Sequence, residues 1–286
     1  MARLGLDAFV TLDLKNIRYL TGFTGTSAAV AVIKRSALFF TDFRYASQAA
    51  GQVTSAKREI TSSLSGGVSK AICGAKAKNI GFEEHKLTAQ LLRKMKRTAK
   101  GKWIPVSIVE GLRLIKDDAE IVLIEKNFGI LKKVIAKVGE IIRPGKRERD
   151  IAAELEYLLR LEGAEGPAFD FIVASGKRSA LPHGVASSKK IRKGEMVTLD
   201  WGAVLDGYNS DNTRNFSVGK PNAKLKKIHD IVLEANKRAI EKVRPGVALK
   251  TIDAAARDFI AKNGYGKEFG HGTGHGLGLD VHENPR

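Results

Sequence analysis

The histidine residues near the end of the sequence offer its clearest chemistry. The stretch 270–283, GHGTGHGLGLDVHE, holds His271, His275 and His282, three of the six histidines in the 286-residue chain. Its closely spaced glycines disfavour a stable helix and let the backbone pass near a ligand. Imidazoles in such a setting are typical of metal ligands or proton-transfer groups. The stretch therefore predicts a site whose other members come from elsewhere in the chain.

A predicted β-hairpin supplies two candidate carboxylates. Segments 196–203 and 208–218 alternate as strands, and the Asp-Gly pair between them is typical of a two-residue turn. That turn would place Leu205 opposite Tyr208, and Asp200 on the same sheet face as Asp211, one diagonal step away. Two carboxylates so close are costly unless a cation or a proton neutralises them.

Each candidate also has a purely structural interpretation. Asp200 could be a strand-end residue, Asp211 a loop carboxylate and His275 a buried imidazole with its own hydrogen bonds. An aspartate between Leu199 and Trp201, however, is disfavoured in a strand without a partner. Two carboxylates and one imidazole together favour a metal site that suits Mn²⁺, Co²⁺, Fe²⁺ or Zn²⁺.

An internal repeat connects these segments. Two copies, beginning near positions 141 and 242, each contain a helix end, an Arg-Pro-Gly turn, a second helix, a glycine and a strand with phenylalanine. Pro144 aligns with Pro245, and the copies lead to His183 and to His275. Duplicated α+β halves usually pack about a pseudo-two-fold axis, so a site between them would draw ligands from both.

Residues 1–115 predict a separate α/β domain, in which short apolar runs alternate with helical patterns. His85 is expected at its surface, and no catalytic cluster is expected there. A capped amphipathic helix is predicted from Asp117 to about Ile142, so residues 116–286 form the second domain. The strands of the first domain are expected at 7–11, 28–33, 37–41, 80–83 and 103–106, and its helices at 43–51, 64–74 and 88–99.

Composition narrows the location and the partners. The single cysteine, Cys73, allows no internal disulfide, and no signal core or membrane-spanning run is present, so a cytoplasmic protein without a membrane partner is expected. The net charge of +18 raises the alternative of nucleic-acid binding. Because the basic clusters lack interleaved aromatics and match no nucleic-acid module, nucleic acid is not the expected partner.

The motifs VTLDWGAVLDGYNSDNTRNF, ALPHG and FGHGTGHGLGLDVHE closely resemble the pita-bread metallopeptidases of family M24, in particular the Xaa-Pro aminopeptidase and prolidase branch. YLTGFTG and LFFTDFRY resemble the N-terminal domain of that branch, so the resemblance covers essentially the whole chain. It implies a ribonuclease-H-like α/β domain of the creatinase/prolidase N-terminal type. An α+β pita-bread domain with an internal pseudo-two-fold repeat would follow.

The resemblance also implies the site and the activity. Two divalent ions, Mn²⁺ first among the candidates, would activate water for hydrolysis of the Xaa-Pro bond in dipeptides or at peptide N-termini. A homodimer acting on proline-containing peptides is implied, and the short first domain leans toward prolidases. The implied metal ligands are Asp200, Asp211 and His275, and the implied catalytic, substrate-binding and proton-moving residues are His183, His271 and His282.

Two further glutamate ligands belong to the family pattern. Asp200 and Asp211 follow Pro144 by 56 and 67 residues, so the same offsets from Pro245 place the glutamates near positions 301 and 312. The sequence ends at 286, and we therefore expect it to be a C-terminally truncated fragment of a longer enzyme. The alternative is a catalytically inactive homologue that binds protein or nucleic acid. Creatine-type C–N hydrolysis ranks last, because the paired aspartates favour metal.

Overall fold

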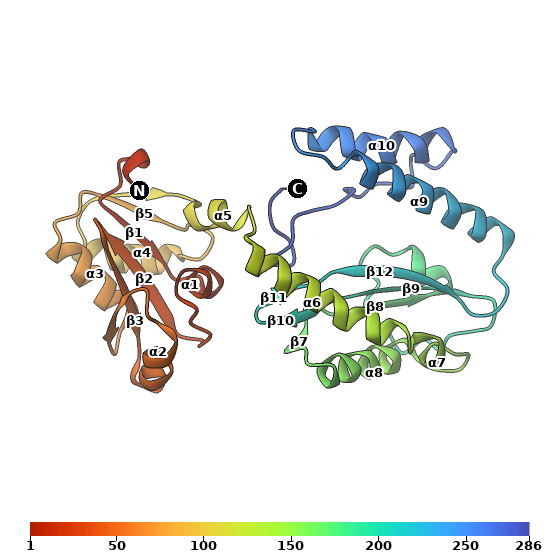
Figure 1. Ribbon diagram of the computed structural model, residues 1–286, viewed down its shortest axis with the longest axis horizontal. Coiled ribbons are helices and arrows are strands. Elements are labelled where there is room, and N and C mark those ends of the chain that lie inside the picture. The colour runs from red at the N-terminus through yellow and green to blue at the C-terminus, as the bar shows by residue number, and fades with distance from the viewer. Residues whose placement is uncertain (286) are drawn as a thin grey trace. The chain divides into compact units, whose positions relative to one another are not determined.

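A computed structural model describes residues 1–285 (Figure 1). The chain forms two compact units, Met1–Ile115 and Lys116–Arg286. Among the described residues, no helix combines the length and the apolar character needed to cross a membrane.

The first unit is built on a six-stranded mixed sheet of order β4-β3-β2-β1-β5-β6. The strand β2 lies near the centre of the sheet and pairs antiparallel with β1 and β3. Its side chains are apolar on both faces of the sheet, as expected for a strand whose two faces are both covered by other elements. β4, β5 and β6 pair in parallel with their neighbours. The strands are β1 (Ala8–Thr11), β2 (Ala28–Ile33), β3 (Ser36–Thr41), β4 (Lys57–Ile60), β5 (Asn79–Phe82) and β6 (Lys102–Pro105).

Helices cover both faces of this sheet. Ala29 and Ala31 of β2 share one apolar cluster with residues of α3 and α4, whereas Val30 shares another with residues of α1 and α2. The five predicted strands and three predicted helices are present within a few residues, but α1, β4 and α5 were not predicted. The helices are η1 (Ala2–Leu4), α1 (Leu14–Thr21), η2 (Phe43–Tyr45), α2 (Ala46–Gln52), α3 (Leu64–Gly74), α4 (Ala89–Thr98) and α5 (Ile108–Arg113).

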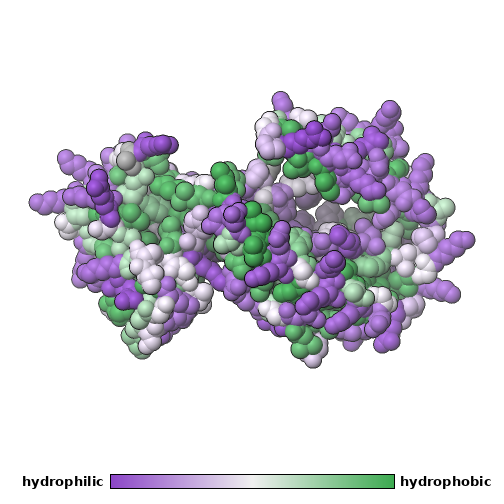
Figure 2. Space-filling view, viewed as in Figure 1, coloured by the Kyte–Doolittle hydropathy of each residue, from purple (hydrophilic) through white to green (hydrophobic). Residues whose placement is uncertain are grey.

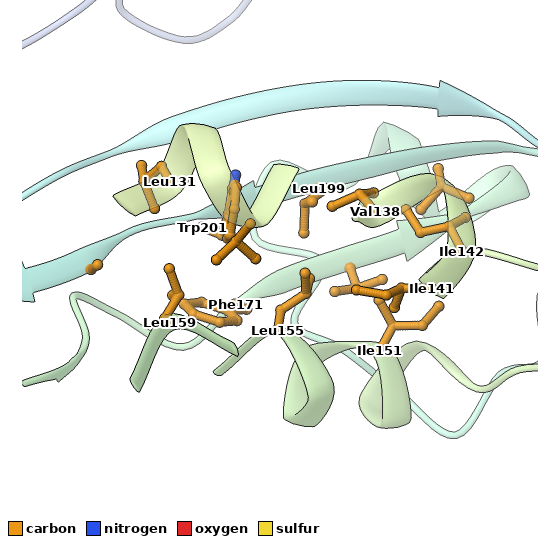
Figure 3. Packing of buried hydrophobic residues seen from close by; sticks show 14 of the residues in the cluster. Leu131, Val138, Ile141, Ile142, Ile151, Leu155, Leu159, Phe171, Leu199 and Trp201 are labelled. Carbon is orange, nitrogen blue, oxygen red and sulfur yellow. The ribbon is translucent and has the colours of Figure 1, made fainter. Parts of the chain in front are cut away.

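The second unit packs helices α6, α7 and α8 against an antiparallel sheet of order β12-β9-β8. Figure 3 shows the core between them, where Leu155 and Leu159 of α8 meet Leu199 and Trp201 of β9, all fully buried. A smaller sheet of order β11-β10-β7 adjoins it. The elements are α6 (Asp118–Ile135), α7 (Val138–Ile141), α8 (Glu148–Leu161), β7 (Gly166–Pro167), β8 (Ile172–Ser175), η3 (Gly176–Ala180), β9 (Met196–Trp201), β10 (Ala203–Leu205), β11 (Tyr208–Asn209) and β12 (Asn212–Ser217).

The helix predicted to continue from Asp117 to about Ile142 is instead interrupted. It starts at Asp117 with the predicted cap, a full capping box with Glu120, but α6 ends at Ile135 and α7 begins at Val138. The Lys137 N–H bonds the carbonyl oxygen of Val134, only three residues back, so the chain tightens there. Val134 and Val138 are both fully buried on either side of this tightened turn.

The predicted hairpin register is confirmed. Leu205 pairs with Tyr208, and the same register pairs Trp201 with Asn212 beyond the middle of the hairpin. Each predicted strand is nevertheless split in two, because the ladder opens at Gly202. A Cβ atom at Gly202 would lie 1.9 Å from the carbonyl oxygen of Ser210, so only glycine permits this close approach of the two chains.

The helical part of the repeat is also confirmed. α9 (Ala223–Lys242) and α10 (Leu249–Lys262) pack together around a small cluster of Ile231, Ala235, Ala239, Ala256 and Ile260. α10 has the length of α8 and begins 101 residues later, the spacing of Pro144 and Pro245. The strand predicted after α10 is wrong for the described residues, since 264–285 forms turns with a single bridge between Gly276 and Glu283. A glycine-rich backbone loses too much entropy in a strand that has no long pairing partner.

The surface agrees with the high net charge. Hydrophilic side chains spread over the visible face of each unit, including the α9–α10 pair (Figure 2). The basic residues of α4, among them Arg93, Lys94, Lys96 and Arg97, are all exposed.

Candidate metal centre

Three side chains of the second unit have the spacing of metal ligands. Single ligand atoms of Asp211, His275 and His282 all lie within 4.8 Å of one another. The Nε2 atom of His275 is 3.4 Å from Oδ2 of Asp211, and the rings of His275 and His282 meet edge to face with 4.4 Å between centroids. The structure thus brings an aspartate of the hairpin to two histidines that lie more than 60 residues later in the chain.

Asp200 lies beside this cluster and contacts Asp211. Burial raises the pKa of Asp200; a hydrogen bond from Thr213 Oγ1, at 2.8 Å, opposes this shift, and the nearby Asp211 carboxyl adds to it. Burial likewise raises the pKa of Asp211, against the opposing influence of His275. Both shifts mean that a second negative charge is costly here unless a cation balances it.

Buried polar side chains hold the hairpin in shape at the opening of its ladder. The Nδ2 atom of Asn127, a fully buried residue of α6, donates to the carbonyl oxygens of Ala203 and Tyr208 at 2.8 and 2.9 Å. Ser210 donates to Oδ1 of Asn127 and accepts from the N–H of Ala203. The backbone groups freed at Gly202 are therefore satisfied, and Asp211 follows directly from a fixed Ser210.

Asn209 joins the histidine-bearing segment to the hairpin. Its backbone N–H and its Nδ2 atom both donate to the carbonyl oxygen of Gly278, at 2.8 and 2.9 Å, and Nδ2 also donates to that of Leu279. Asn209 is 5% exposed, so these bonds are made away from water. The residue is two positions before Asp211, and it therefore fixes the distance between the hairpin and the turn that carries His282.

The histidine-bearing segment is also closed on itself. Gly276 and Glu283 exchange two backbone hydrogen bonds, and the Glu283 carboxylate accepts from the Asp280 N–H and from Lys116 Nζ. A Cβ atom at Gly278 would lie 2.8 Å from that carboxylate, so a larger residue there would displace the Glu283 side chain. This turn keeps His275 and His282 on opposite limbs of one small loop, close enough for their rings to touch.

We expect Asn209→Ala to weaken divalent-metal binding by about 10-fold to 100-fold, the range typical when a partner that orients ligands is removed. The reason is that the loop bearing both histidines loses the two bonds from Asn209 Nδ2 to the carbonyl oxygens of Gly278 and Leu279, and keeps only the backbone bond to the hairpin. Titration calorimetry with Mn²⁺ measures the change, with Asn215→Ala on β12 as the control. Unchanged affinity would show that Asn209 does not position the histidines.

The other two predicted histidines lie outside this cluster. His183 and His271 are exposed, and His271 Nδ1 lies 2.9 Å from the carbonyl oxygen of Gly272. A pocket of about 190 Å³ nevertheless has Leu181 and Pro182, the residues before His183, and Asp200 in its lining. The loop that carries His183 therefore forms one wall of a pocket that also contacts Asp200, a residue of the candidate metal site.

The first unit holds a second group of titratable side chains around His85, which is exposed as predicted. Its Nε2 atom lies 3.2 Å from Asp13 Oδ2 and 3.3 Å from Glu110 Oε1. Asn16 links Glu110 to the buried Glu83, with 2.7 Å from its Nδ2 atom to each carboxylate. The residues come from three separate elements, so no sequence spacing pointed to them.

The donor set of the second unit fits divalent metal ions. Carboxylate oxygens and imidazole nitrogens are the ligands that Mn²⁺, Fe²⁺, Co²⁺ and Zn²⁺ accept, and a cation would balance the two half-buried carboxyls. Asn209, Asn127 and Glu283 were not predicted as part of this site. Asn127 could have been noticed as an amide on the apolar face of its helix, but its partners depend on the tertiary fold.

Comparison with known proteins identifies the family. Residues 123–286 match the model of metallopeptidase family M24, and residues 1–115 match the creatinase/prolidase N-terminal domain. The chain is 41% identical to the uncharacterized peptidase YqhT of Bacillus subtilis, with 99% of this chain and 81% of the relative covered.

Solved structures agree with this family. The fold matches an Xaa-Pro dipeptidase from Bacillus anthracis with a TM-score of 0.96 and 41% identity, over 99% of this chain and 81% of that one. It matches an X-Pro aminopeptidase from Thermotoga maritima with a TM-score of 0.91 and 40% identity, over 99% and 83% of the two chains. The chain belongs to metallopeptidase family M24, with a creatinase/prolidase N-terminal domain followed by the pita-bread domain.

Proposed function

We propose that the protein is a metal-dependent peptidase that hydrolyses the Xaa-Pro bond, in dipeptides or at the N-terminus of longer peptides. The observation that carries the proposal is the meeting of Asp200, Asp211, His275 and His282 at one place. The family membership and the names of the Bacillus anthracis and Thermotoga maritima relatives support this substrate class.

In this proposal Asp200, Asp211 and His275 hold divalent ions, with Mn²⁺ as the first candidate and Co²⁺, Zn²⁺ or Fe²⁺ as others. Bound ions would supply Lewis acidity at the scissile carbonyl and activate water for attack. The raised pKa values of the two aspartates fit this role, because a cation removes the cost of holding both as carboxylates.

The remaining histidines act on the substrate. His282, whose ring touches that of His275, would donate to the carbonyl oxygen as negative charge develops on it. His183 and His271, both exposed, would bind the peptide and deliver a proton to the leaving proline nitrogen. Protonation of that nitrogen is needed because the deprotonated secondary amine of proline is a very poor leaving group.

The partners and location complete the proposal. A homodimer acting on proline-containing peptides is supported by the family resemblance, and the single cysteine is consistent with a cytoplasmic location. The non-catalytic alternative is not favoured, because the relatives reported above are named as peptidases.

Removal of metal provides the test. We expect the protein, when treated with a chelator, to lose hydrolysis of Ala-Pro and of Ala-Pro-Ala, and Mn²⁺ to restore it. The ratio of the two rates separates dipeptidase from aminopeptidase activity, and Ala-Ala is the control substrate. Full activity after complete metal removal, or equal rates on Ala-Ala, would contradict the proposal.

A further inference from the structure

One buried carboxylate outside the metal-type site organises the loop that carries His183. Glu148 begins α8 and is 0% exposed. Its Oε1 atom accepts from the N–H and the hydroxyl of Ser175, both at 2.8 Å. Its Oε2 atom accepts from the N–H and the hydroxyl of Ser187, at 3.1 and 2.6 Å. Ser175 and Ser187 are the two ends of the segment 176–186, so one side chain fastens both ends of the loop.

Arg178 extends this connection into the loop itself. Its Nε atom donates to Oε2 of Glu148 at 3.0 Å, and its Nη2 atom donates to the carbonyl oxygen of Val185 at 2.7 Å. The ion pair is half buried on the arginine side and fully buried on the glutamate side. Five donors therefore converge on one carboxylate, and charge-assisted bonds of this kind are the stronger ones.

The burial of Glu148 is fully compensated by these contacts. Burial by itself would raise the pKa of Glu148, but the hydrogen bonds from Ser187 and Ser175 outweigh it and the pKa is lowered. The group is therefore a carboxylate, as its set of donors requires.

The fastened loop is a wall of the pocket beside Asp200. Ser179, Ala180, Leu181 and Pro182 line that pocket together with Asp200. His183 follows directly, so its position relative to Asp200 depends on the path of this loop. The candidate metal ligands lie elsewhere: Asp200 and Asp211 belong to the hairpin, and His275 follows α10. Among the described contacts, no hydrogen bond joins any of these three residues to Glu148.

We propose that Glu148 is a positioning residue, which holds the loop 176–186 so that Leu181, Pro182 and His183 form the substrate wall of the site. This inference rests on the proposed function for its link to peptide hydrolysis. Glu148 does not touch the reacting atoms, and its action passes through Ser187 and Arg178 to the loop. A displacement of about 1 Å in such a wall costs up to roughly 100-fold in rate.

Glu148→Gln tests the proposal directly. The amide oxygen can still accept from Ser175, but the amide nitrogen cannot accept from Ser187 or Arg178. The second end of the loop therefore loses its side-chain bonds and keeps only backbone bonds, such as that from the Arg149 N–H to the Ser187 carbonyl oxygen. We expect hydrogen exchange of residues 179–187 to be at least about 10-fold faster, and kcat/KM on Ala-Pro to fall about 10-fold to 100-fold with a raised KM. Mn²⁺ affinity should stay within about twofold, because no metal-type residue loses a contact.

Two controls separate positioning from general destabilisation. Asp150→Asn makes the same chemical change on α8, at a residue that pairs only with Arg147 among the described contacts, and should leave exchange and kinetics unchanged. Ile151→Val removes a methyl group from the core beneath the same helix and should lower the melting temperature without raising KM.

The outcomes are decisive in either direction. Unchanged loop exchange in Glu148→Gln, or a kcat/KM no lower than that of Ile151→Val, would overturn the proposal. If the unaltered protein does not hydrolyse any Xaa-Pro peptide, the proposed function fails. The exchange and metal-affinity measurements then still decide whether Glu148 holds the loop.

Discussion

Asp200→Asn is expected to lower kcat/KM for Xaa-Pro hydrolysis by at least about 100-fold, while raising the melting temperature of the metal-free protein. The loss follows from removal of a proposed ligand. The gain in stability follows from the site itself, since Asp200 and Asp211 are both half-buried, in contact, and held at raised pKa values. An amide in place of one carboxyl removes their repulsion without changing side-chain volume.

Addition of metal should make the unaltered protein more stable than Asp200→Asn, the reverse of the order expected without metal. Mn²⁺ that binds the folded state will raise the melting temperature of the unaltered protein and will have little effect on Asp200→Asn. Differential scanning calorimetry with and without Mn²⁺ measures both shifts, and Asp206→Asn is the matched control. Asp206 is exposed in the turn of the same hairpin at φ 46°, a conformation that asparagine tolerates. A metal-free Asp200→Asn protein that melts lower than the parent would contradict the electrostatic argument.

Glu83→Gln is expected to stabilise the first unit at pH 8 by about 3 kcal/mol and to have little effect near pH 5. Burial raises the pKa of Glu83 from 4.5 to about 7, with Glu110 and Asp13 adding to it and bonds from Thr11 and Asn16 opposing it. The residue is 2% exposed, so water screens it little. Between these pH values the folded state binds a proton that the unfolded chain has lost, and stability therefore falls as pH rises from about 4.5 through 7.

Denaturant unfolding followed by tryptophan fluorescence measures this effect. The chain has two tryptophans, Trp103 in the first unit and Trp201 in the second, so a Trp201→Phe background reports on the first unit. Glu59→Gln, on the exposed strand β4, is the control and should leave the pH dependence unchanged. An equally steep loss of stability between pH 5 and 8 in Glu83→Gln would show that another group carries it.

Local patterns were sufficient where a short-range rule decides the structure. The Asp206-Gly207 pair specified the hairpin register, and that register brought Asp200 and Asp211 to one face. The repeat specified α10, and short apolar runs specified β1, β2 and β3. The family motifs predicted the fold of both units, and the two family models match residues 1–115 and 123–286.

Features that depend on distant partners were not predictable in this way. α6 ends at Ile135 because the chain tightens at Lys137, although the apolar pattern continues past it. Asn127, Glu148 and Asn209 are polar residues whose donors and acceptors lie tens of residues away, so their roles become visible only in the folded chain. The strand expected after α10 is absent, because within residues 1–285 its glycines have no neighbouring strand to pair with.

The apolar cluster between α9 and α10 is small, so this part of the second unit should open locally at a lower free-energy cost than the core under β9. Three of its five buried members are alanines, whereas the core under β9 contains Trp201, Leu199 and Leu155. Arg257 of α10 holds the carbonyl oxygens of Phe269 and His271, so the approach to His275 moves with the weaker part. Asp211 belongs to the stronger part. A metal ion bound by both Asp211 and His275 would thus couple the less stable α9–α10 part to the more stable core. Metal concentration would then control how often α9 and α10 open locally.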